Sequence, residues 1–206
     1  MGIKRLEYCL DDDYPTINWD RHSKMASLWL EIDERHRSDL PYDDILRRIA
    51  YQLPMNRRWD RVDFISMFPG IGVSVRARAA LESLGVPGMR FLGFRVNLEP
   101  FFLFYTERVV DCLDRERSEI RYFPSSPERV MRVVSYAFTQ ERLRPCDLFT
   151  VPELSDGMFF WTQQTFVTDE ARTILEGAGV FGIRFEPLPV PGECTEPDDP
   201  AGQGSV

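Results

Sequence analysis

The sequence has no closely spaced cysteine pair, no histidine cluster and no long apolar run. It contains only two histidines, and its four cysteines are widely scattered, at Cys9, Cys112, Cys146 and Cys194. Zinc sites need closely spaced ligands, and disulfide scaffolds need an oxidising compartment. We therefore expect free thiols, with no metal or other cofactor. No stretch approaches the ~20 apolar residues of a membrane span, and the charged start does not resemble a secretory signal, so a cytoplasmic protein without a membrane partner is expected.

A strongly basic charge balance and phosphate-binding motifs are also missing. The glycine pair in Phe68-Pro69-Gly70-Ile71-Gly72 lacks both the G-x-G-x-x-G pattern and a following lysine. The net charge is −8, and acidic residues outnumber basic ones by 9 to 6 in residues 1–40 and by 12 to 4 in residues 141–206. A nucleic-acid partner would need a clustered basic face, so none is expected. The acidic ends favour a basic protein partner, unless they serve only solubility.

The strongest positive signal is an internal repeat. Residues 73–91 and 167–185 align without a gap and are identical at ten of nineteen positions. Each copy has a hydroxyl residue suited to an N-cap (Ser74 or Thr168), then apolar residues at helical spacing. Each copy then has a glycine suited to a helix end (Gly85 or Gly179), followed by an apolar strand. The repeat therefore predicts one helix–turn–strand unit used twice.

The fold class predicted from these patterns is α+β, with an antiparallel meander between the two repeat copies. Its three strands are expected at residues 89–96, 101–105 and 108–113, because the breaks between these apolar runs are short. A first strand is expected at residues 4–10 and a helix at residues 43–53. Residues 187–206 are rich in proline, glycine and acidic residues, which is typical of a disordered tail.

One acidic cluster allows two interpretations. Asp111, Asp114 and Glu119 follow an apolar run closely, and paired carboxylates can do acid–base chemistry or bind a cation. A small-molecule-binding or hydrolytic domain would use these three residues. Carboxylates at this spacing also cap turns, which is the structural alternative.

Several short stretches occur in an order that has a counterpart in a known family. They are Val73-Ser74, Val110-Asp111-Cys112-Leu113-Asp114, Ser118-Glu119, Phe149, Phe166-Val167-Thr168 and residues 178–185. Over about residues 66–186 the chain thus resembles immunity protein family eleven of bacterial polymorphic toxin systems. The resemblance implies a non-enzymatic cytosolic inhibitor that binds and neutralises a cognate toxin, such as a nuclease, encoded next to it.

The resemblance also suggests how the chain is organised. Residues 61–186 would form the family-like core, residues 1–60 a variable N-terminal segment packed on it, and residues 187–206 the tail. Because the acidic, tryptophan-bearing stretch lies outside the shared core, we expect it to bind the toxin. Its candidate contact residues are Asp11, Asp12, Asp13, Trp19, Asp20, Trp29, Asp33 and Glu34. A homodimer joined through exposed strands is a further alternative.

Overall fold

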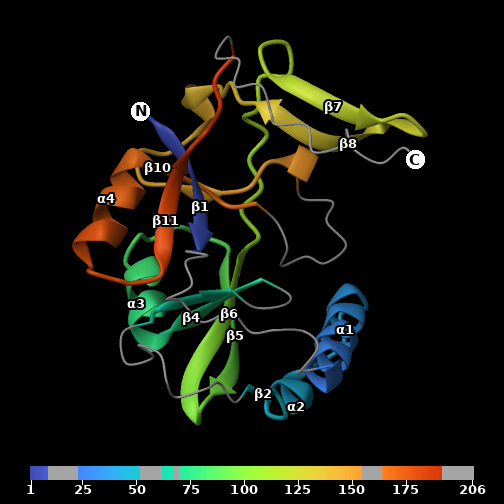
Figure 1. The fold of residues 1–206 in the computed structure, drawn as a ribbon, viewed down its shortest axis with the longest axis vertical. Coiled ribbons are helices and arrows are strands. Elements are labelled where there is room, and N and C mark those ends of the chain that lie inside the picture. Colours follow the sequence, from blue (N-terminus) through green and yellow to red (C-terminus); the bar gives the residue numbers. More distant parts are fainter. Residues whose placement is uncertain (9–22, 52–61, 67–69, 155–163, 192–206) are drawn as a thin grey trace, which may run out of the picture.

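Two β-sheets, one above the other in Figure 1, form the framework of the protein. The computed structural model describes residues 1–8, 23–51, 62–66, 70–154 and 164–191. Helices and antiparallel strands are both present in these segments, so the α+β prediction is confirmed.

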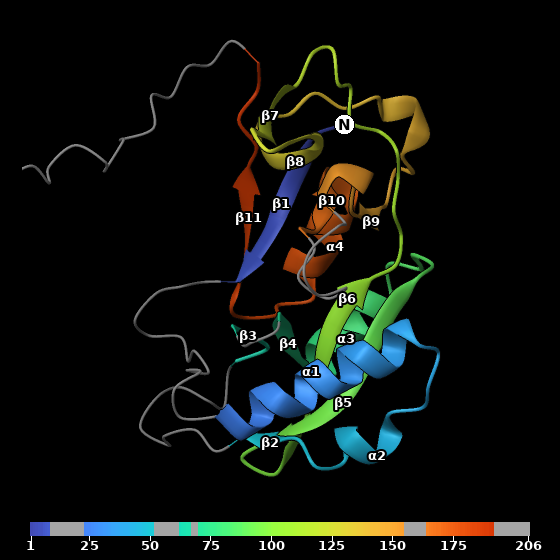
Figure 2. The same ribbon diagram turned by 90° about the vertical axis from the view of Figure 1, so that its right-hand side faces the viewer.

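The lower sheet has five strands and is covered on its outer face by two helices. Its order is β2 (Ala50–Tyr51), β5 (Met89–Val96), β6 (Glu99–Thr106), β4 (Ile71–Ser74) and β3 (Phe64–Ser66). Only β2 and β5 pair in parallel. Helices α1 (Ser23–Arg37) and α2 (Asp43–Leu46) lie against this sheet, as Figure 2 shows for α1. They bury an apolar stripe on it, and this burial drives their docking.

The upper sheet combines the two ends of the chain. Its order is β11 (Ile183–Pro187), β1 (Ile3–Tyr8), β10 (Phe166–Thr168) and β9 (Leu148–Phe149). Its outer face packs against the segment that contains β7 (Glu119–Phe123) and β8 (Ser126–Ser135). Two short 3₁₀ turns follow, η3 (Gln140–Arg142) and η4 (Pro152–Leu154).

The repeated helix–turn–strand unit is confirmed. It appears as β4, α3 (Val75–Glu82) and β5, and again as β10, α4 (Asp169–Gly177) and β11. The Ala77 amide donates to Ser74 Oγ at 3.1 Å, and the Ala171 amide lies 3.5 Å from Thr168 Oγ1, so both hydroxyl caps form. Gly85 has a φ of 64° and Gly179 a φ of 63°, a left-handed conformation that is costly for residues with a Cβ.

The repeat extends beyond the stretch that the sequence shows. In each unit a third strand separates the two repeat strands, β6 in the lower sheet and β1 in the upper, while β3 and β9 are the matching outer strands. The registers also agree, because Phe91 faces Phe104 on β6 while its counterpart Phe185 faces Leu6 on β1. Each unit is therefore a four-stranded arrangement with one helix, and the chain's first strand completes its last unit.

The inner faces of the two units share one core. Matched residues meet in a single buried cluster, including the pairs Ala77/Ala171 and Leu81/Leu175 of the two helices. These four side chains have exposed fractions of 0%. Since each unit buries its helix against the other, the units stabilise one another.

Two predicted elements differ from the observed ones. Residues 108–113 do not form the third strand of a meander, because local bonds such as Cys112 N–H to the Val110 carbonyl bend the backbone. This segment instead crosses from the lower sheet to the upper, with only isolated bridges at Val109 and Leu113. The helix expected at residues 43–53 ends at Leu46, since residues 50 and 51 pair with β5.

Candidate partner-binding surface

Trp29, predicted at the contact surface, is instead a core residue. Its exposed fraction is 0%, and its ring packs edge-on against Phe94 at a centroid distance of 6.0 Å. Its indole Nε1–H donates to the hydroxyl of Tyr51 at 2.7 Å, so its polar atom is also satisfied internally. The physical reason is that α1 lays its apolar stripe on the lower sheet. Trp29 therefore has no surface to offer a partner.

The other described members of the acidic stretch differ in exposure. Asp33 is only 7% exposed, and its Oδ2 lies 3.1 Å from Nε of Arg37. Glu34 is exposed on the solvent side of α1. The remaining candidates lie outside the described residues, and they are Asp11, Asp12, Asp13, Trp19 and Asp20.

The acidic cluster at residues 111–119 has structural partners. Asp111 contacts Arg115 at 3.1 Å and Arg142 at 3.0 Å, while Oδ1 of Asp114 accepts the amides two and three residues later. Glu119 opens β7 as an exposed residue. The described residues contain no group of three or more side chains suited to hold a metal ion. These contacts favour the turn-capping alternative.

Two buried aspartates occupy matched positions in the repeat and were not foreseen. Asp63 precedes β3 and accepts both Nε and Nη2 of Arg76, and its Oδ2 also accepts the Phe181 amide at 2.9 Å. Asp147 precedes β9 and accepts Nε and Nη2 of Arg108 at 2.6 and 2.7 Å. The segments that join these aspartates to the two repeat copies differ in length. An ungapped alignment of the copies therefore does not place the two aspartates at matching positions. Asp63 therefore ties the first unit to the second through Phe181, and Asp147 ties the second unit to the start of the crossing segment.

Strands β7 and β8 form a two-stranded antiparallel ribbon, here called the β7–β8 ribbon, on the outer side of the upper sheet (Figure 1). Among the residues that the structure describes, β7 pairs with no strand other than β8. Tyr122 is 42% exposed and Met131 45% exposed. The ribbon therefore offers an open strand edge next to large apolar side chains, and such edges readily accept another chain.

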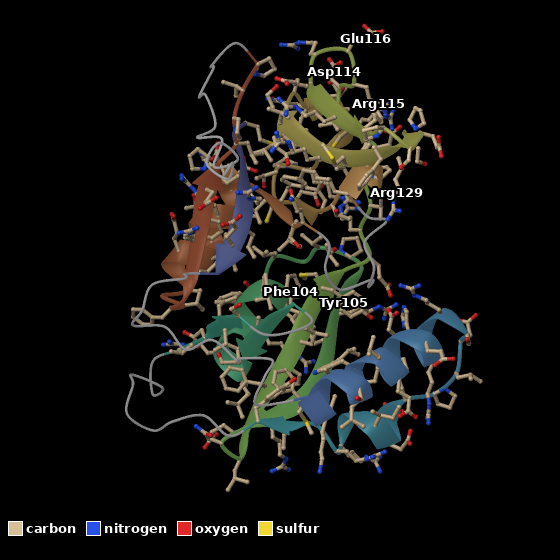
Figure 3. All side chains as sticks on the ribbon, turned by 45° about the vertical axis from the view of Figure 1, so that its right-hand side comes forward. Phe104, Tyr105, Asp114, Arg115, Glu116 and Arg129 are labelled. Carbon is tan, nitrogen blue, oxygen red and sulfur yellow. The ribbon has the colours of Figure 1, made fainter. Side chains whose placement is uncertain are left out.

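A groove of about 510 Å³ lies between the β7–β8 ribbon and η4. Its lining combines apolar side chains with two arginines and two glutamates, and Figure 3 labels both arginines, Arg115 and Arg129. Arg129 lies over the ring of Phe123, with its Cζ 5.3 Å from the ring centroid. The groove thus has mixed polarity, as protein-binding surfaces commonly do.

Glu153 is the buried charge of this groove. Its side chain is 6% exposed, and Nη2 of Arg115 lies 2.5 Å from its Oε1. Neither of its carboxylate oxygens has a hydrogen-bond partner with acceptable geometry among the described residues. Burial, followed by the negative charge of Glu153, raises the pKa of the neighbouring Cys112 thiol to about 12.

An accessible ribbon edge beside a groove of mixed polarity is a surface to which another protein chain can add a strand. The model of the immunity protein family Imm11 matches residues 42–189, and the chain belongs to this family. The match includes the β7–β8 ribbon and its groove but neither β1 nor α1. No curated protein matches the sequence. Among the described residues, no helix is long and apolar enough to span a membrane.

Proposed function

We propose that this immunity protein acts in the cytoplasm, where it binds a cognate toxin and neutralises it without catalysis. Membership of the immunity family is the observation that carries this proposal. The toxin would be encoded next to it as part of a polymorphic toxin system, and its active site or substrate groove would be occluded. The net charge of −8 supports a basic toxin, such as a nuclease, since opposite charges accelerate and orient association.

The acidic stretch of the first forty residues is one proposed contact region. Among the candidate contact residues that the structure describes, Glu34 is exposed. The candidates outside the described residues are Asp11, Asp12, Asp13, Trp19 and Asp20. Charged groups at the rim of an interface affect association rate and salt dependence more than they affect stability. They would therefore attract the toxin rather than hold it.

The test is titration calorimetry of the purified protein against the product of the neighbouring gene, together with co-expression. One-to-one binding that abolishes the toxin's activity and restores growth is the expected result. A soluble, folded protein that neither binds this product nor restores growth would contradict the proposal.

The same titration can examine the contact region. Replacing Asp11, Asp12, Asp13, Asp20 and Glu34 with lysine should weaken binding and reduce its dependence on salt. The matched control reverses five exposed carboxylates outside this stretch, Asp43, Glu99, Glu116, Glu141 and Glu176. Equal affinities of the two variants would move the contact region elsewhere. Light scattering of the free protein would decide the homodimer alternative.

Replacing Asp111, Asp114 and Glu119 with alanine addresses the small-molecule or hydrolytic alternative. Their contacts predict a lower melting temperature and a protein that still binds the toxin, because Asp111 and Asp114 hold an arginine pair and a turn. A hydrolytic activity of the protein that disappears with these carboxylates, while the fold persists, would favour the alternative.

A further inference from the structure

Resting on the proposed function, we infer that the groove beside the β7–β8 ribbon receives a lysine or arginine side chain of the toxin. Glu153 would be its ion-pairing partner. The groove lies within the family-matched residues 42–189, whereas the acidic stretch of the first forty residues lies outside them. It is therefore a second contact site that depends on different residues.

The burial of Glu153 carries the inference. A carboxylate whose side chain is 6% exposed has lost most of its hydration, and its Oε2 receives no compensating hydrogen bond from the described residues. Such desolvation is costly for a charged group. Since this cost is already met in the free protein, a cation that displaces Arg115 pairs with the carboxylate through a charge-assisted hydrogen bond without desolvating it again.

Arg115 can make room for the incoming cation. Its side chain is 54% exposed, and its Nη2 lies 2.5 Å from Glu153 and 3.1 Å from Asp111. If the toxin's cation takes over Glu153, Arg115 retains Asp111 as its partner. The exchange leaves no buried charge unpaired, which is the condition for a buried ion pair to be tolerated.

The walls of the groove fit the rest of a long basic side chain. Tyr122, Phe123 and Met131 supply apolar surface for the methylene stem of lysine or arginine. The groove's four charged side chains are Arg115, Arg129, Glu128 and Glu153. Arg129 is exposed and lies over Phe123, and Glu128 is also exposed. Glu153 is thus the buried charge of the four, and it selects for a positive group.

The experiment compares Glu153→Gln with wild type, and Glu116→Gln is the matched control. Glu116 is exposed on the turn beside Arg115, outside the groove lining (Figure 3). Titration calorimetry against the neighbouring gene's product should show at least tenfold weaker binding for Glu153→Gln and unchanged binding for Glu116→Gln. Circular dichroism should show a folded Glu153→Gln protein.

A second arm does not depend on the toxin. The blocked peptide acetyl-Leu-Lys-Leu-amide is titrated into wild type, with the norleucine analogue as the neutral control, while the Met131 methyl resonance is followed by NMR. The expected result is a saturable shift with the lysine peptide only, which is lost in Glu153→Gln. Failure of wild type to bind the gene product would contradict the proposed function. The groove inference would be overturned if Glu153→Gln bound the toxin as tightly as wild type. It would also be overturned if the Met131 methyl resonance did not shift on addition of the lysine peptide.

Discussion

Replacing each of the two matched buried aspartates with asparagine should cost very different amounts of stability. Asp63 and Asp147 stand at equivalent repeat positions, and both accept hydrogen bonds from a paired arginine. The difference lies in those arginines, because the Arg108 side chain is 18% exposed while that of Arg76 is 52% exposed. An arginine that can turn towards water loses little when its partner is neutralised, whereas a buried one loses its compensation.

The magnitudes follow from these surroundings. Asp147 is 0% exposed and also accepts the amides of Arg144 at 3.2 Å and Leu148 at 3.0 Å, so either orientation of an asparagine amide places its NH₂ against donors. Breaking such a buried pair typically costs about 3–5 kcal/mol. For Asp63→Asn we expect about 1–2 kcal/mol, because the asparagine oxygen can keep the Phe181 amide while its NH₂ faces the Ser74 hydroxyl, which can accept, and the exposed Arg76 rehydrates.

Urea unfolding followed by tryptophan fluorescence and circular dichroism measures both free energies of unfolding. The control is a double-mutant cycle of Asp147→Asn with Arg108→Gln, in which the two losses should not add, because either change alone breaks the same pair. If Asp63→Asn proves as damaging as Asp147→Asn, burial of the arginine does not set the cost, and the reasoning fails.

Two further predictions concern local features. Leu98 lies in the turn between β5 and β6, where it is 82% exposed and has a φ of 72°. A left-handed conformation costs a non-glycine residue about 1–2 kcal/mol, and glycine avoids this cost. Glycine instead loses more conformational entropy on folding, which offsets about 0.5–1 kcal/mol of the gain. Leu98→Gly should therefore raise the free energy of unfolding by about 0.5–1 kcal/mol, and a lower urea midpoint would contradict this. Cys112, with a pKa of about 12, should be about one part in 10⁴ thiolate at pH 8. Peptide-level mass spectrometry should find it alkylated by iodoacetamide only after unfolding, so rapid labelling of the native protein would refute its burial.

The repeated units could be predicted because their signals are local. A hydroxyl cap, an apolar helical face and a left-handed glycine act within a few residues, so Ser74 and Gly85 indicate their element almost regardless of context. The position of β1 between β10 and β11 depends instead on residues more than 150 positions away, which no local pattern encodes. Helix α1 did leave a signal, since Met25, Leu28, Trp29 and Ile32 have helical spacing.

The candidate surface was harder to foresee. Trp29 was expected at a surface because its stretch lies outside the family-like core, yet α1 packs its indole against the lower sheet. The groove draws on Arg115, on the β7–β8 ribbon and on η4, segments that the fold brings together. Glu153 belongs to no sequence motif. It stands out because its carboxylate is buried without a hydrogen bond from the described residues, and this is a property of the folded chain.

An ion pair next to the repeat units joins the two ends of the segment that carries the proposed binding groove. The crossing segment that contains the β7–β8 ribbon begins at Arg108 and returns to the upper sheet at Asp147, and these two residues form a bidentate ion pair. The pair therefore closes the base of a long excursion of the chain. At the same base, the Gly88 carbonyl accepts the Glu107 amide at 2.7 Å, and a Cβ on Gly88 would lie 3.2 Å from the Arg108 backbone nitrogen. Since preorganising a contact surface lowers the entropy cost of binding, the Arg108–Asp147 pair would favour tight binding at the proposed groove by fixing the base of the segment that carries the ribbon.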